Sequence, residues 1–85
     1  MGKKLKITNW FLSPHAVLRL EERKIEIKEL ESILVDPDEV IEQGQKYILA
    51  KKFENRKDNM LAAVVLEKKE DLWLVITVMV NFEKK

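Results

Sequence analysis

Two apolar segments near the C-terminus, residues 60–67 (MLAAVVLE) and 72–80 (LWLVITVMV), constrain the fold of this chain more than any other feature. Each has the length of a β-strand and is bounded by charged or polar residues. Only the four residues KKED separate them, and so short a connection cannot form the crossover that parallel neighbours need. The two segments therefore predict antiparallel neighbours in one sheet.

The N-terminal half carries helical signals. Ser13 is a good N-cap and Pro14 suits the first helical position, so we expect helix one to run from Pro14 to about Arg23. A second helix follows, with apolar residues at helical spacing. It should end near Val35, because Pro37 disfavours a helical conformation in the residue before it.

Further strand signals complete the predicted fold. Residues 40–42 and 46–53 read as strands joined by a turn around Gly44, and residues 4–8 are a candidate edge strand. Short connections favour antiparallel neighbours. We therefore predict a single α+β domain over residues 1–85, with two N-terminal helices packed on one face of a three- to four-stranded antiparallel sheet.

The last predicted strand is apolar on both of its faces. Alternation places one set of side chains on one face: Leu72, Leu74, Ile76, Val78 and Val80. It places another set on the opposite face: Trp73, Val75, Thr77 and Met79. Two short helices cannot cover both faces of a sheet, so the second face is expected either to meet another protein or to line a binding surface. We predict Trp73, Val75 and Met79 as its partner-binding residues, in a homodimer or a heterodimer.

Composition limits the classes of function. The chain has 16 basic and 15 acidic residues, so any role with nucleic acid must rest on a local patch. It has no cysteine, which excludes disulfides and cysteine-type zinc sites. The apolar runs are too short for a bilayer and MGKKLK is no signal peptide, so we expect a cytoplasmic protein without membrane contact. Its richness in lysine and glutamate is typical of thermophile proteins.

The only histidine begins a polar row on the first predicted helix. At about 100° per residue, His15, Arg19 and Arg23 lie on one side of the helix and flank its apolar arc. An imidazole can transfer a proton near neutral pH, and a guanidinium can hold a phosphate. The row is therefore a candidate catalytic site for phosphodiester cleavage without a metal. Alternatively, these residues pair locally with Glu22, or fix the helix to the sheet.

Residues outside the row are candidates for RNA contact. Tyr47 and Lys51 lie on the strand 46–53, and Arg56 lies in the polar turn after it. Packing of the Tyr47 ring in the core is the alternative. These three residues, Tyr47, Lys51 and Arg56, form the predicted RNA-binding set.

Other kinds of site lack support in the sequence. The acidic stretch DPDE at residues 36–39 has no glycine-containing calcium loop around it, so we predict no metal site. Only Gly2 and Gly44 are available, too few for a phosphate-binding loop, and no cofactor is predicted. A DNA-reading helix-turn-helix is disfavoured, because the acidic second helix would repel phosphates.

Several segments together resemble one small prokaryotic family. They are SPHAVLRLEERKI, a second helix, DPDEVIE, KYILAKK and VITVMV, which cover most of the chain. The family that they resemble is catalogued as domain of unknown function 4258, which typically shows His-Ala, then Arg and Arg-x-Ile at these spacings. Five residues carry the match: His15, Ala16, Arg19, Arg23 and Ile25. The chain departs from the pattern at Lys24, where the family often has Gly, and at Glu26, where a capping Ser is usual.

The resemblance also implies a fold and a function. The family's arrangement looks like the RelE/ParE/BrnT toxin fold, and those toxins are mostly metal-independent messenger-RNA endonucleases, free or ribosome-associated, or gyrase inhibitors. By this analogy the chain is expected to be a toxin-like endoribonuclease that acts on RNA or the ribosome and binds an antitoxin-like protein. The alternative is a non-catalytic interaction module that uses its open sheet face.

Overall fold

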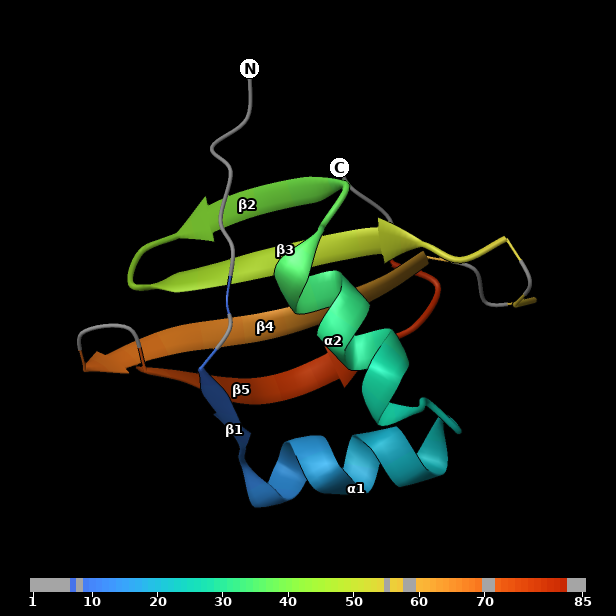
Figure 1. Cartoon of the computed structure of the whole chain (residues 1–85), viewed down its shortest axis with the longest axis horizontal. Coiled ribbons are helices and arrows are strands. Elements are labelled where there is room, and N and C mark those ends of the chain that lie inside the picture. The colour runs from blue at the N-terminus through green and yellow to red at the C-terminus, as the bar shows by residue number, and fades with distance from the viewer. Residues whose placement is uncertain (1–6, 8, 55, 58–59, 70–71, 83–85) are drawn as a thin grey trace.

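The computed structural model of the chain describes residues 7, 9–54, 56–57, 60–69 and 72–82. These residues form two helices and five strands (Figure 1). In chain order the elements are β1 (Trp10–Leu12), α1 (Pro14–Glu22), α2 (Ile27–Val35), β2 (Glu39–Gln43), β3 (Lys46–Lys52), β4 (Met60–Lys69) and β5 (Leu72–Met79).

Both helices have the predicted limits. Ser13 caps α1, Pro14 occupies its first turn, and Arg23 is its C-cap residue. The second helix ends at Val35, two residues before Pro37. The four strands β2 to β5 form the predicted antiparallel meander.

The sheet as a whole corrects the predicted fold class. It has five strands in the order β1-β5-β4-β3-β2, and β1 runs parallel to β5, so the sheet is mixed. The predicted antiparallel sheet of three to four strands is therefore wrong, and we do not retain the RelE-like description. The chain between β1 and β5 contains two helices and three strands, so it is long enough to join parallel neighbours. The predicted strand at residues 4–8 lies outside the described residues except for Ile7, which is in no strand.

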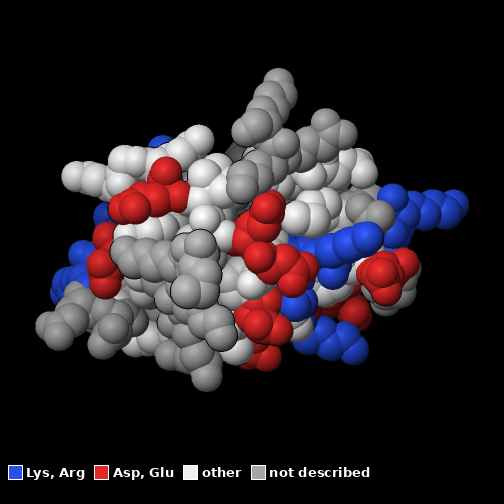
Figure 2. Space-filling model, turned by 90° about the horizontal axis from the view of Figure 1, so that it is seen from above, with Lys and Arg blue, Asp and Glu red and all other residues white. Residues whose placement is uncertain are grey.

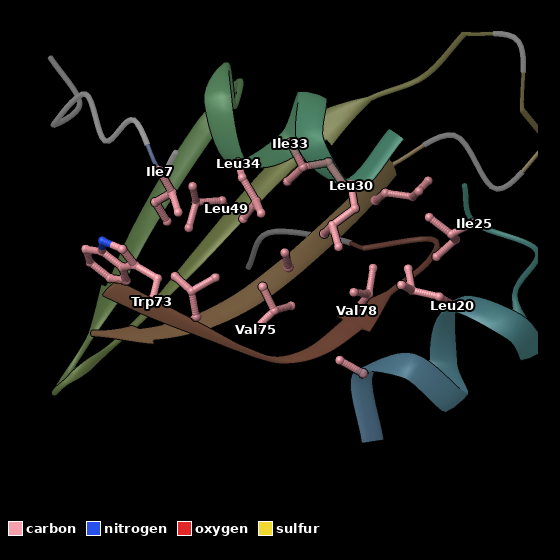
Figure 3. Close-up of a cluster of buried hydrophobic side chains, with 14 residues drawn as sticks. Ile7, Leu20, Ile25, Leu30, Ile33, Leu34, Leu49, Trp73, Val75 and Val78 are labelled. Atoms are coloured by element: carbon pink, nitrogen blue, oxygen red, sulfur yellow. The ribbon is translucent and has the colours of Figure 1, made fainter. Parts of the chain in front are cut away.

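The helices lie on the same face of the sheet (Figure 1). Helix α1 packs along β5 and β1, and α2 crosses β3 and β4. The main hydrophobic core fills the layer between the helices and the sheet, as Figure 3 shows. Leu30, Ile33 and Leu34 point from α2 into this core and are fully buried.

A β-bulge in β5 changes which side chains face the helices. Val64 pairs with Thr77 and Val65 pairs with Val75, so Ile76 is the extra residue. A bulge shifts the alternation of side chains by one position. The residues of this segment that join the helix-side core are accordingly odd-numbered before Ile76 and even-numbered after it: Trp73, Val75, Val78 and Val80. The single apolar face predicted from strict alternation along 72–80 is wrong for this reason.

Candidate functional site

The predicted polar row forms a short chain of contacts on the surface of α1. The Nε of Arg19 donates a hydrogen bond of 3.3 Å to Nε2 of His15, and Nη1 of Arg19 lies 2.9 Å from Oε1 of Glu22. His15 is exposed, and so is Arg23, one turn beyond Arg19. The structure thus brings a proton-transfer group and a guanidinium together in contact with solvent, although Glu22 already binds that guanidinium.

Ser13 holds α1 against the sheet. Its Oγ accepts a hydrogen bond of 3.0 Å from the backbone of Ala16 and donates one of 2.7 Å to the carbonyl of Ile76. Its own N–H donates to the carbonyl of Val75 at 3.0 Å. The start of the helix is therefore fixed at the bulge of β5. The sequence marked Ser13 only as a helix cap, because the partner strand lies about 60 residues away.

Arg56 binds the turn between α1 and α2. Its Nη1 donates to the carbonyl of Lys24 at 3.1 Å, and its Nη2 donates to that of Arg23 at 3.0 Å. Nη1 also lies 3.0 Å from Oε1 of Glu29, and the Arg56 side chain is only 16% exposed. Carbonyls at a helix C-terminus carry partial negative charge, so a guanidinium stabilises them. Arg56 therefore joins the loop after β3 to the turn between the helices.

The turn that Arg56 binds contains a residue in left-handed conformation. Lys24 has φ of 54°, in the region that favours glycine. The N–H of Lys24 donates to the carbonyl of Glu21 at 3.3 Å, and the N–H of Ile25 donates to that of Leu20 at 2.9 Å. These two bonds form a Schellman motif, and the buried side chains of Leu20 and Ile25 share the core beside it. Position 24, where the family often has glycine and this chain has lysine, is therefore the one residue of this turn with a positive φ.

The structure does not gather the predicted RNA-binding set on one surface. Lys51 donates from Nζ to the carbonyl of Asp36 at 2.9 Å, at the end of α2, whereas Arg56 lies at its beginning. The nine residues of α2 separate these sites by about 13 Å. Tyr47 packs on the core, with its ring edge-on to that of Trp73 at 5.5 Å. The RNA-binding role of these residues stays a prediction.

A small pocket accompanies Lys51 at the end of α2. Its volume is about 250 Å³, and its lining residues are Glu31, Ser32, Val35, Asp36 and Lys51. The Lys51 Nζ lies 3.5 Å from Oδ2 of Asp36 across this site. The neighbouring Asp38 accepts a hydrogen bond from the backbone of Lys52 at 2.8 Å. The carboxylates of the DPDE segment thus make contacts that close the junction between α2 and the sheet.

The sheet face opposite the helices carries a continuous apolar path. Ile41 pairs with Ile48, which pairs with Val64. Leu66 lies two residues after Val64 in β4, on the same face. It pairs with Leu74 of β5, which in turn pairs with Phe11 of β1. Every step joins neighbours on the same face, so the path crosses all five strands. We call it the open-face band: Phe11, Ile41, Ile48, Val64, Leu66 and Leu74.

The predicted partner-binding residues lie on different faces. Trp73 is 8% exposed and Val75 is fully buried, and both belong to the core beneath the helices. Met79 lies after the bulge and, with Phe82, packs instead against Ile48, Ala50 and Ala62 on the opposite face. These three residues are therefore buried within the chain itself. The sheet thus has apolar side chains on its second face, as expected. They are the residues of the open-face band, which does not include Trp73 and Val75.

Charges of both signs share the surface next to β2. Figure 2, which looks onto the edge of the sheet that β2 forms in Figure 1, shows acidic side chains across the middle and basic ones mainly towards the ends. In this view of the described residues neither sign forms a broad field. Within the described part of the chain, no group of three His, Cys, Asp or Glu residues is placed to hold a metal ion. Neither helix is long and apolar enough to cross a membrane.

Comparison with known proteins identifies a family. No curated protein and no solved structure matches the chain. A family model does match, over residues 12–80, which include every element from β2 to β5, both helices and the polar row. The chain belongs to the family described as Domain of unknown function (DUF4258).

Proposed function

We propose that this chain is a protein-interaction domain that binds another polypeptide through the open-face band. The observation that carries this proposal is the path of apolar neighbours from β2 to β1 on the face that neither helix covers. Every member of this path is at least partly exposed except Ile48, against which Phe82 packs. Burial of apolar surface drives most protein association. Contiguous apolar patches on a surface mark interaction sites more often than isolated apolar residues do.

The charge of the chain also supports this choice. The net charge is +1, whereas proteins that bind nucleic acid electrostatically usually carry a basic surface. The members of the band are all uncharged, and Phe11 at its β1 end is 42% exposed. Such a surface is suited to an apolar partner.

Site-specific photocrosslinking in the native host tests the proposal. Phe11 is replaced by p-benzoylphenylalanine, which keeps an aromatic ring at the end of the band. Irradiation is expected to join the chain covalently to a polypeptide partner. The control carries the same group at Leu18, which is 51% exposed on α1, on the other side of the molecule from the band.

The two positions give opposite expectations. An adduct at position 11 that is much stronger than any at position 18 supports the proposal. Equal labelling of both positions, or none at position 11 in a folded protein, contradicts it. Circular dichroism of each purified variant verifies the fold.

A second candidate function is cleavage of RNA without a metal. It is favoured by the 3.3 Å hydrogen bond between Arg19 and His15 on the solvent-exposed side of α1. In such a reaction His15 would transfer the proton, while Arg19 and Arg23 would hold the phosphate. For that role the Arg19 guanidinium must exchange Glu22 for the substrate, since the two side chains are paired at 2.9 Å. An endoribonuclease of a toxin–antitoxin system would use the chain in this way.

A further inference from the structure

We infer that the partner at the open-face band presents an acidic amphipathic helix, whose apolar side packs on Phe11, Leu66 and Leu74. Its carboxylates pair with Lys46 and Lys69, which border these three residues. This inference rests on the proposed interaction function and specifies the chemistry of the partner.

The chain itself covers part of the face opposite the helices. Ile48, Ala50 and Ala62 are buried there. Met79 and Phe82 pack over them. A second sheet that spanned the whole face would meet this cover, so the partner element must fit on the part of the face that stays exposed.

The exposed part has the width of one helix. Leu66, Leu74 and Phe11 are direct partners in one row, and each is exposed or partly exposed. The row spans β4, β5 and β1, and strands lie about 4.8 Å apart, so it is about 10 Å long. An α-helix with its side chains is about 10–12 Å across. One helix therefore covers the row.

Two lysines border this row and determine the charge that a partner should carry. Lys46 continues the row, because it is the direct partner of Leu66. Lys69 pairs with Leu72, which precedes the core residue Trp73 in β5 and so lies on the face away from the helices. Both lysines are exposed, and neither forms an ion pair with a described residue. Carboxylates on the partner would attract these ammonium groups, whereas basic side chains would be repelled.

The spacing of the two lysines suits successive turns of a helix. Lys69 follows Leu66 in β4, and Lys46 lies one strand away from Leu66, so the Cα atoms of the two lysines are about 11 Å apart. Seven residues of helix rise about 10.5 Å. Carboxylates at positions i and i+7 of the partner helix thus reach both lysines from one side, and its apolar side rests on the row.

An anionic membrane would also offer negative charge to an apolar surface bordered by lysines. Surfaces that bind anionic lipids usually gather about four to eight basic residues. The two lysines here, with Lys68 next to them, are fewer, and the net charge of the chain is only +1. A protein helix is therefore favoured over a membrane.

Fluorescence anisotropy with two labelled probe peptides tests the inference on the purified chain. The acidic probe is an amphipathic helix of about 18 residues, with leucines along one side and glutamates at i and i+7 beside them. The basic probe has lysines in place of the glutamates. The wild type should bind the acidic probe roughly tenfold more tightly than the basic one.

Charge reversal at the two lysines should reverse this preference. Lys46→Glu/Lys69→Glu is the test variant. Lys28→Glu/Lys57→Glu is the matched control, because both of its lysines are exposed, one on α2 and the other beyond the opposite end of β3 from Lys46. The control should keep the preference of the wild type. Circular dichroism verifies the fold of each variant.

Every other outcome overturns the inference. Equal binding of the two probes, tighter binding of the basic one or no binding of either excludes the acidic helix, as does an acidic preference that survives Lys46→Glu/Lys69→Glu. Binding to phosphatidylglycerol vesicles without binding of the acidic probe identifies a membrane instead. Photocrosslinking from position 11 separates the inference from the proposed function. An adduct with a polypeptide that both charge reversals leave unchanged retains the interaction function alone, and the absence of any adduct ends both.

Discussion

The guanidinium of Arg56 lies 3.0 Å from the carboxylate of Glu29, 27 residues away in the sequence, and both side chains are largely buried. Oε1 of Glu29 also accepts a hydrogen bond of 2.9 Å from the backbone of Glu26, at the start of α2. The pair therefore connects the loop after β3 with the cap of α2 and with the last carbonyls of α1. It fixes the angle between the two helices and so the position of α1 over β5.

Removal of Arg56 should destabilise the protein. In Arg56→Ala the Glu29 carboxylate and two helix-end carbonyls lose their donor, which should lower the free energy of unfolding by about 2–3 kcal/mol. The neighbour Lys57 is exposed, so Lys57→Ala should change it by less than about 0.5 kcal/mol. Urea denaturation of both variants measures the difference. Equal stabilities would show that the contacts of Arg56 contribute little.

Glycine at position 24 should stabilise the turn between the helices. Lys24 adopts φ of 54°, which costs a residue with a Cβ about 1–2 kcal/mol in the folded state. Glycine lacks this cost, but its greater freedom in the unfolded chain lowers the free energy of unfolding by roughly 0.4–1 kcal/mol. We expect Lys24→Gly to raise the free energy of unfolding by about 0.5–1 kcal/mol. The control Lys28→Gly, within α2, should lower it by about 1 kcal/mol. Thermal and urea unfolding compare the two, and destabilisation by both would contradict the role of the left-handed conformation.

Loss of the Ser13 hydroxyl should loosen α1 from the sheet. Ser13→Ala removes both the helix cap and the bond to the Ile76 carbonyl, at an expected cost of about 1–2 kcal/mol. Ser32→Ala is a matched control, because that hydroxyl bonds only to the preceding turn of its own helix among the contacts seen. Its effect on the free energy of unfolding should stay within about 0.5 kcal/mol. If the two substitutions cost the same, the link between α1 and the bulge is unimportant.

The polar row should be dispensable for stability. His15 is exposed and its bond to Arg19 lies at the surface, so His15→Ala should change the free energy of unfolding by less than about 0.5 kcal/mol. If the chain cleaves RNA, the same substitution should slow cleavage by about 10²–10⁴-fold. Arg19→Lys should also impair cleavage, because an ammonium cannot reproduce a bidentate grip on phosphate. An RNA gel in the presence of a chelator measures the rate. An inert wild type would end the nuclease candidate.

Local signals made the helices and the meander predictable. The pair Ser13-Pro14 marks the start of α1, and Pro37 marks the end of α2, because these effects act within a few residues. The Gly44 turn and the short KKED connection likewise impose antiparallel neighbours. The contact between His15 and Arg19 followed from helical spacing alone.

Features that depend on distant parts of the chain were not predictable. The three residues of β1 are too few for a visible alternation, and they form a strand because β5 pairs with them. The bulge at Ile76 leaves no mark in an apolar run, yet it reverses the faces of the residues after it. Arg56 resembled a free basic residue, because its acceptors lie 27 to 33 positions away. Strict alternation therefore assigned Trp73 and Val75 to the wrong side of the sheet.

The central claim, that the open-face band is the interaction surface, is tested most directly by photocrosslinking from position 11 in chains that also carry either Val64→Lys or Val17→Lys. Val64 lies in the middle of the band, and Val17 is 42% exposed on α1, so the two variants make the same chemical change on different surfaces. An ammonium at the centre of an apolar interface should raise the dissociation constant for the partner at least about 100-fold, so Val64→Lys should lose the adduct formed from position 11. Val17→Lys should give as much adduct as the chain without it. Equal adducts from the two folded variants would contradict the claim.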